Sequence, residues 1–247
     1  MPICIAGMHR SGTSMVARLL QTCGLFLGPE DELGFDSNDG EPHFENVRFV
    51  AFNDEILGRL GGSWNNPPDF PVAWETMPEI AALTVKAKKL IKRLSKQHNW
   101  GWKDPRNSLT LPFWRAIVPE LKVVVCLRNP LEVAHSLCKR GDLIGVPWFL
   151  LWLTYYRELL SAIPAQQRVV THYESYFVDP TAELQRVSNR IGMEVQSGVI
   201  PRASAHIAND LRHNRMTTSG LSATNVPDEV LALYLKLCQE AGHVYQQ

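Results

Sequence analysis

A short loop rich in glycine and hydroxyl groups follows the first apolar run of the sequence. Residues 7–14 read GMHRSGTS; residues 2–6 before them are apolar, and the residues after them place apolar side chains on one helical face as far as Gly24. Backbone N–H groups of such a turn, and of the helix N-terminus that follows, point to one place and favour an anion there. Glycine-rich turns between a strand and a helix also occur without a ligand, so the loop by itself indicates an anion site without identifying the anion.

The rest of the sequence alternates between apolar runs typical of strands and amphipathic runs typical of helices. We expect strands at residues 2–6, 100–103, 123–127 and 168–172, and helices after the loop, at about 43–60, 80–94, 147–162 and 227–241, and from Asn129 and Asp179. This alternation predicts an α/β fold, a P-loop-like three-layer domain with a central parallel sheet flanked by helices. With 247 residues and no repeat, we expect one domain over residues 1–247.

Charge and cysteine content argue against several classes of protein. The 25 Lys and Arg residues balance 25 Asp and Glu residues, which disfavours a dedicated nucleic-acid binder and leaves room for a local basic pocket. The outward lysines of the helix expected at 80–94 are most simply a solvated face. Five cysteines without CxxC spacing are interpreted as reduced thiols. We find no signal peptide, and the apolar stretch 146–153 is too short for a membrane span, so we expect a cytoplasmic protein.

The loop departs from the phosphate loop of nucleotide triphosphatases at one position. Those proteins place a lysine directly after the second glycine, where this sequence has Thr13, and here the positive charge stands at Arg10. The apolar strand expected at 123–127 ends in Arg128 rather than in an acidic residue that could hold magnesium. A kinase or NTPase-like nucleotide-binding protein is therefore kept as an alternative that lacks both its lysine and its metal ligand.

Two motifs in this order resemble the sulfotransferases that use 3′-phosphoadenosine 5′-phosphosulfate (PAPS). In that family a [Lys/Arg]-[Ser/Thr]-Gly-Thr-[Thr/Ser] loop surrounds the 5′-phosphosulfate, and an Arg that ends a central strand clasps the 3′-phosphate with a Ser eight residues later. Here the first motif is RSGTS, and the second, CLRNPLEVAHSL, contains Arg128 and Ser136. A third match is the segment Thr171–Glu174, similar to one that lies by the adenine. The resemblance implies donor contacts from His9, Arg10, Ser11, Gly12, Thr13, Ser14, Arg128, Ser136 and Tyr173.

The spacing of Arg128 and Ser136 also has a physical reason that is independent of the family. An Arg at a strand end and a Ser two turns into the next helix can converge on one phosphate, since the guanidinium offers a planar fork and the Ser a hydroxyl. The plainer alternative is an Arg that meets only solvent and a Ser on a helix surface. The Arg-Lys-Gly loop of the cytosolic small-molecule enzymes is missing, and the basic segment 211–215 is not equivalent to it. The pattern is closer to bacterial sulfotransferases and to the carbohydrate and tyrosylprotein enzymes.

The resemblance implies a transferase that moves a sulfuryl group to an acceptor hydroxyl, releases adenosine 3′,5′-bisphosphate and requires no metal. We expect Arg10 to stabilise charge on the departing oxygen, because a guanidinium cannot act as an acid at neutral pH. For the base that takes the acceptor's proton we favour Glu45, then His43. Unperturbed His has the better pKa, and Glu45 would need its pKa raised by burial. Glu45 could instead be a first-turn helix glutamate.

A cluster of charged residues follows the strand expected at 100–103. Its sequence is Lys103-Asp104-Pro105-Arg106. Ligands of parallel sheets bind beyond the carboxyl ends of the strands, so Lys103 or Arg106 could meet the donor sulfate or the acceptor, with Asp104 orienting them. Of the two cations we favour Lys103 as a catalytic residue, because similar enzymes have the same motif. The alternative is a structural ion pair at a turn.

The acceptor stays open between a glycan, a tyrosine and a small lipid or phenol, with a carbohydrate slightly favoured. Trp64 lies in a loop that could provide a stacking surface for a sugar, whereas Trp148 and Trp152, four residues apart, are expected in the core. A nucleotide-binding module without catalytic activity is the remaining alternative. The sequence does not indicate an oligomeric state.

Overall fold

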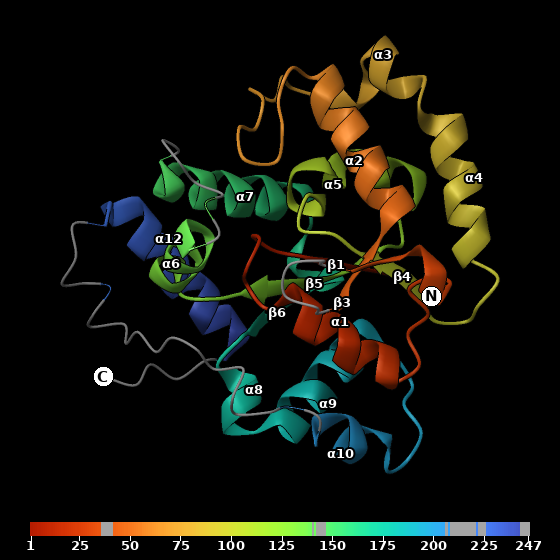
Figure 1. Ribbon diagram of the computed structural model, residues 1–247, viewed down its shortest axis with the longest axis vertical. Helices are drawn as coiled ribbons and strands as arrows, with labels where there is room; N and C mark the ends of the chain where they lie inside the picture. Colours follow the sequence, from red (N-terminus) through yellow and green to blue (C-terminus); the bar gives the residue numbers. More distant parts are fainter. Residues whose placement is uncertain are drawn as a thin grey trace.

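Four strands pair in parallel to form the sheet at the centre of the structure (Figure 1), which is a computed structural model. It describes residues 1–35, 42–139, 141, 147–205, 207, 221 and 226–242. The strands are β1 (Pro2–Ala6), β4 (Trp100–Lys103), β5 (Lys122–Leu127) and β6 (Arg168–His172), in the order β4-β1-β5-β6. Ile3 of β1 pairs with Gly101 on one side and with Lys122 on the other. The four strands expected from apolar runs are all present.

Helices cover both faces of this sheet (Figure 1). One face carries α1 (Thr13–Thr22), α8 (Ser175–Val178), α9 (Pro180–Ile191) and α10 (Val199–Ser204). The other carries α2 (Val47–Arg59), α3 (Pro78–Ala81), α4 (Thr84–Leu94), α5 (Asn107–Ile117), α6 (Pro130–Lys139), α7 (Trp148–Ala162) and α12 (Asp228–Ala241). Because side chains alternate along a strand, Ile3 and Ile5 pack against the first set while Cys4 and Ala6 pack against the second. The predicted three-layer α/β fold is confirmed.

Two predicted helix starts are formed by the capping residues the sequence offers. The side-chain oxygen of Asn129 accepts a hydrogen bond from the backbone N–H of Leu131 at 3.0 Å, ahead of α6. Asp179 accepts one from Ala182 at 2.9 Å, ahead of α9, which ends at the left-handed Gly192. Such caps satisfy N–H groups that have no partner inside the helix.

The helix expected at 43–60 begins later than predicted. Residues Pro42–Asn46 form strand β3, which pairs antiparallel with β2 (Leu33–Phe35), and α2 starts at Val47. The reason is local: Phe44 has a left-handed backbone, φ 55°, and Asn46 caps α2 by accepting from Arg48 at 3.1 Å. Glu45 therefore lies in a strand, and its interpretation as a first-turn helix glutamate is wrong.

The helix expected at 80–94 is divided into two. Leu83 N–H donates to the carbonyl of Ile80 at 2.9 Å, a tight i to i+3 turn that separates α3 from α4. The sequence pattern missed α5, which contains Pro112. Short 3-10 turns occur at Glu30–Glu32, Trp74–Thr76 and Ala165–Gln167.

None of the helices in the described part of the chain is long and apolar enough to cross a lipid bilayer. All five cysteines are free, and only Cys138 is exposed. Trp152 is completely buried in the core, as expected, while Trp148 is partly buried against it.

Candidate active site

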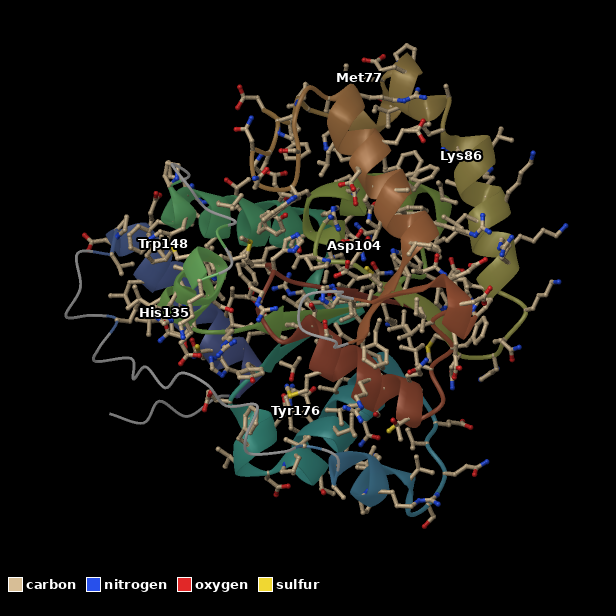
Figure 2. All side chains as sticks on the ribbon, in the orientation of Figure 1. Met77, Lys86, Asp104, His135, Trp148 and Tyr176 are labelled. Carbon is tan, nitrogen blue, oxygen red and sulfur yellow. The ribbon has the colours of Figure 1, made fainter. Side chains whose placement is uncertain are left out.

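The carboxyl ends of the four parallel strands bring the predicted motifs to one edge of the sheet. The loop 7–14 follows β1, Lys103 ends β4, Arg128 follows β5 and Tyr173 follows β6. Asp104, which follows Lys103 in the sequence, is completely buried, and Figure 2 labels it below α2. Segments that are far apart in the sequence therefore meet where an open parallel sheet ordinarily binds its ligand.

The backbone of the loop 7–14 is shaped as an anion-binding turn. Arg10 and Gly12 both have left-handed backbones, φ 66° and 84°. A Cβ on Gly7 would lie 2.4 Å from the carbonyl oxygen of Cys126, so the loop runs too close to β5 for any larger residue. No side-chain hydrogen bond caps α1, within the described residues, and its first N–H groups face the loop. This geometry favours an anion at the start of α1.

The side chain of Ser11 anchors the loop from below. Its Oγ lies 3.2 Å from the hydroxyl of Tyr156, and that hydroxyl donates to the carbonyl of Cys126 at 2.7 Å. A phenol has one proton, so Ser11 is the donor to Tyr156. Ser11 is 1% exposed, and its backbone N–H donates to the carbonyl of Met8 at 3.1 Å, so Ser11 fixes the shape of the turn.

Arg128 and Ser136 both contact the loop. Arg128 Nη1 donates to the carbonyl of Arg10 at 3.2 Å and its Nε donates to Glu132 at 2.8 Å. Arg10 Nε donates to Ser136 Oγ at 2.9 Å. Arg128 is only 8% exposed, so the interpretation of a solvent-facing arginine is wrong. The two motifs recognised separately in the sequence form one continuous group of polar contacts.

Tyr173 lies beneath this group. The guanidinium of Arg128 lies over its ring, 4.3 Å from the centre. A Cβ on Gly12 would lie 2.5 Å from the same ring, so glycine is required where α1 begins. Tyr173 therefore supports both the loop and Arg128, and burial raises the pKa of its hydroxyl.

Lys103 connects three segments through its ammonium group. Nζ donates to Ser14 Oγ at 3.0 Å, to the carbonyl of His43 at 3.0 Å and to Glu45 Oε1 at 2.6 Å. Lys103 is 2% exposed and has three N–H donors, which these three acceptors use. Glu45, predicted as the base, thus lies beside the phosphate loop, and His43 meets Lys103 through its backbone.

The pKa of Glu45 is shifted in the direction opposite to the one its role as base requires. Burial disfavours the carboxylate, but Lys103, through its charge and its hydrogen bond, together with Arg106 outweighs burial and lowers the pKa of Glu45 to about 2. Burial therefore does not provide the raised pKa that Glu45 would need as a base. Glu45 is ionised at neutral pH and paired with Lys103.

His9 is held neutral inside the same group. Burial, together with the positive charges of Arg106, Lys103 and Arg10, lowers the pKa of His9 to about 3. Its ring centre lies 4.4 Å from that of Trp64, and its Nε2 has no hydrogen-bond partner among the described residues. The hydroxyl of Tyr155 donates to the carbonyl of Trp64 at 2.8 Å and so fixes the Trp64 loop against α7. The sequence carried no signal for this contact between Trp64 and the loop.

A buried polar network supports the segment 103–106 from within. Asn53 donates to Asp104 at 2.8 Å, and Asp104 accepts from both the backbone and the guanidinium of Arg106 at 3.0 Å. Arg106 Nε also lies 2.7 Å from Asp54. Asp104 thus pairs with Arg106, a contact that fits both the orienting role and the alternative of a structural ion pair at a turn. Burial raises the pKa of Asp104, which Arg106 and Asn53 counter.

The basic segment 211–215 lies outside the described residues, as do residues 36–41 ahead of β3.

Comparison with known proteins agrees with this geometry. The profile of the sulfotransferase family matches residues 2–197. Among solved structures, sulfotransferase STF9 from Mycobacterium avium is 14% identical with a TM-score of 0.59, over 95% of this chain and 76% of that one. The sulfotransferase domain from the curacin biosynthetic pathway is 14% identical with a TM-score of 0.57, over 99% of each chain. The sulfotransferase domain of the Synechococcus PCC 7002 olefin synthase is 17% identical with a TM-score of 0.53, over 96% of this chain and 94% of that one. A comparison with curated protein sequences gives no match.

Proposed function

Because the chain belongs to the sulfotransferase family, we propose that it moves a sulfuryl group from PAPS to the hydroxyl of an acceptor. The observation that carries the choice of donor is the hydrogen bond between Arg10 and Ser136. It joins the anion-binding turn at α1 to the Arg128 group at α6. A donor with a phosphosulfate on its 5′ side and a phosphate on its 3′ side needs two adjacent anion sites of this kind.

In this proposal the backbone of the loop 7–14 and the start of α1 hold the 5′-phosphosulfate, with Thr13 and Ser14 adding hydroxyls. Arg128 and Ser136 hold the 3′-phosphate, where a buried guanidinium and a hydroxyl suit a doubly charged group. Tyr173, already packed on Arg128, lies beside the base. The support for these roles is that all three elements meet at one edge of the sheet.

The transfer is a displacement at sulfur. The acceptor oxygen forms a bond to sulfur while the bond from sulfur to the bridging oxygen breaks, and the electron pair leaves with adenosine 3′,5′-bisphosphate. Charge grows on that bridging oxygen, and Arg10 and Lys103 are the cations beside the start of α1 that could stabilise it. Catalysis in this scheme consists mainly of positioning and electrostatics.

The acceptor's proton goes to Glu45 in this proposal. Its carboxylate is ionised and lies within 2.6 Å of Lys103, next to the phosphate loop. The sulfate group of the donor, bound beside Lys103, would compete with Glu45 for the ammonium group of Lys103. This competition would raise the pKa of Glu45 from its low value. His43 is the second candidate, because its backbone places it on the same strand two residues away.

For the acceptor we favour a carbohydrate. Trp64 is partly exposed beside His9, and an aromatic face next to the loop could stack on a sugar ring. We further propose a bacterial-type enzyme that works in the cytoplasm. The five free cysteines support the reducing compartment in this proposal.

Calorimetry with adenosine 3′,5′-bisphosphate tests the donor assignment. The wild type should bind, and Arg128→Ala should weaken binding more than about tenfold, since a charge-assisted bond contributes roughly 1.5–3 kcal/mol. Arg10→Ala should weaken it as well. Arg202→Ala, an exposed arginine on α10, is the matched control and should bind like the wild type.

Absence of binding by the wild type contradicts the proposal, and tighter binding of ATP with magnesium would support a kinase or NTPase instead. Turnover of labelled PAPS with a panel of acceptors separates an enzyme from a silent nucleotide-binding module.

A further inference from the structure

Helix α4 carries a concentration of positive charge on the side that faces away from the protein. Residues 80–103 contain no aspartate or glutamate, although the whole chain has a net charge of zero. Figure 2 shows Lys86 on α4 and several nitrogen-ended side chains that extend from this helix away from the rest of the molecule. The charge of the chain is therefore balanced overall and unevenly distributed.

Four lysines form what we call the basic face: Lys88, Lys89 and Lys92 on α4, and Lys96 just after its end. All four are exposed, and none forms an ion pair with a described residue. Their neighbours differ, because Lys86 pairs with Glu55 and Arg93 with Glu32. Like charges one helical turn apart repel each other, so the basic face is a site where an anionic partner would relieve repulsion.

The helix is held rigidly under this face. Ala87, Leu90 and Leu94 are buried in the core on its other side. The lysines of α4 therefore project from a fixed support. Lys88 and Lys92 lie about one turn apart, and Lys96 follows two residues after the end of the helix. A line of charges on a fixed helix suits a linear partner with regularly spaced negative groups.

A row of ion pairs connects the basic face with the candidate active site. Arg93 of α4 and Arg48 of α2 share a single carboxylate, that of Glu32. Arg48 lies at the start of α2, and its N–H donates to Asn46, the residue that follows Glu45 in β3. The side chain of Glu45 in turn pairs with Lys103 beside the phosphate loop. A partner lying on α4 would thus lead toward the hairpin that carries Glu45.

Two other polyanions fit this surface less well. Residues 84–98 contain no phenylalanine, tyrosine or tryptophan on which nucleic-acid bases could stack. The exposed large hydrophobic residues of the described chain are dispersed over separate segments, so α4 has no apolar patch that would insert into a membrane. These residues are Val47, Val72, Val85, Leu150 and Val178.

We infer that the basic face of α4 binds an anionic glycan chain, with carboxylate or sulfate groups, and guides it to the active site. The inference rests on the proposed function, and it narrows the acceptor to a charged polysaccharide. Each transfer adds a negative group to the chain, so the product binds this face more tightly than the acceptor did. Because the enzyme then holds its product more tightly than its acceptor, it would transfer several sulfuryl groups along the same glycan chain.

Binding of fluorescent chondroitin sulfate, measured without donor at low ionic strength, tests the inference. Chondroitin sulfate should bind more tightly than unsulfated chondroitin, and neutral dextran should not bind. The variant Lys88→Gln/Lys92→Gln should bind chondroitin sulfate about tenfold more weakly. The slope of the logarithm of its binding constant against the logarithm of the salt concentration should become shallower by about one for each lysine removed.

The control variant is Lys122→Gln/Lys236→Gln, which removes two lysines from other elements, β5 and α12. It should bind chondroitin sulfate like the wild type. Equal binding by the two variants, or binding of dextran, overturns the inference. So does preference for duplex DNA or phosphatidylserine vesicles over chondroitin sulfate, because the face would then serve another partner.

A kinetic measurement adds a second readout. In Lys88→Gln/Lys92→Gln the KM for a charged polysaccharide acceptor should rise while kcat is unchanged. Neither lysine takes part in the proposed binding of adenosine 3′,5′-bisphosphate. Binding of this nucleotide therefore tests the donor assignment, and binding of the glycan tests the basic face, independently of each other.

Discussion

Arg10 Nε donates a hydrogen bond to Ser136 Oγ at 2.9 Å, although the two residues are 126 positions apart in the chain. The contact crosses from the loop after β1 to the second turn of α6. It places the hydroxyl of Ser136 beside the one cationic side chain within the loop 7–14. The two motifs therefore form one group of contacts, and the donor site we propose includes both.

Replacing Ser136 by Ala should weaken the binding of adenosine 3′,5′-bisphosphate by about 3–10-fold, since one neutral hydrogen bond contributes roughly 0.5–1.5 kcal/mol. Calorimetry measures the change. Ser161→Ala is the control, because Ser161 is also a helical serine and its hydroxyl donates to the backbone carbonyl of Glu158 on α7. Equal affinities for Ser136→Ala and the wild type would contradict the assignment of the 3′-phosphate to this residue.

Gly12→Ala should destabilise the protein by about 2–4 kcal/mol and reduce donor affinity, because it adds backbone strain and a clash. The new Cβ would lie 2.5 Å from the ring of Tyr173, which Arg128 prevents from moving away. Gly61→Ala is the matched control: its φ is also positive, at 81°, and no atom lies within 4 Å of the added Cβ. Urea unfolding should show a loss of about 1 kcal/mol for Gly61→Ala, from strain only. Equal losses in the two variants would rule out the packing argument.

Glu45→Gln should lower kcat about 10²–10⁴-fold with little change in the affinity for adenosine 3′,5′-bisphosphate, because the amide cannot accept the acceptor's proton. Steady-state kinetics with labelled PAPS measures kcat. Glu55→Gln is the control, since Glu55 also lies between two cations, Arg59 and Lys86, on the surface of α2. If Glu45→Gln keeps its kcat, the base lies elsewhere and His43→Asn is the next variant to measure.

The ion pair of Glu45 with Lys103 should make the free energy of unfolding depend on pH in the acid range. The pKa of Glu45 is about 2 in the folded protein and near 4.5 when unfolded, so the pair stabilises fully above pH 4.5 and is lost as the pH falls toward 2. Between pH 5 and pH 2 the wild type should lose up to about 3 kcal/mol more than Glu45→Gln. Urea unfolding at several pH values measures the difference. Parallel stability curves for the two proteins would show that the pair contributes nothing.

Asn53→Leu should cost about 3–5 kcal/mol, because it leaves buried polar groups without partners. Asn53 donates to Asp104 and accepts from Thr110 and from the indole of Trp114. Asn189→Leu on the surface of α9 is the control and should stay within about 0.5 kcal/mol of the wild type. Thermal or denaturant unfolding distinguishes the two. A small effect at Asn53 would mean that the network adjusts without it.

Sequence pattern predicted the sheet because its strands are short apolar runs with clear ends. It also predicted the helix starts at Asn129 and Asp179, where one side chain forms the cap. The hairpin that carries Glu45 was missed, since a left-handed Phe44 and the capping Asn46 decide locally against a longer helix. Neither residue type excludes a helix by itself.

The candidate active site was likewise predicted only in part. Arg10 and Arg128 were found because both belong to motifs at strand ends. The contact of His9 with Trp64, and that of Asp104 with Asn53, join segments that no local pattern connects. The low pKa of Glu45 depends on Lys103, a residue of another strand, and sequence spacing gives no distance between them.

The position of β1 between β4 and β5 has a consequence for how the protein is made. All five residues of β1 are buried in the finished sheet, and both neighbouring strands come roughly a hundred residues later in the chain. A ribosome that adds about 5–20 residues each second needs several seconds or more to supply them. During that time the first strand has no sheet to join, so the nascent chain exposes it to chaperones and to other unfinished chains. The stretch that later supports the phosphate loop is thus a point of vulnerability during synthesis.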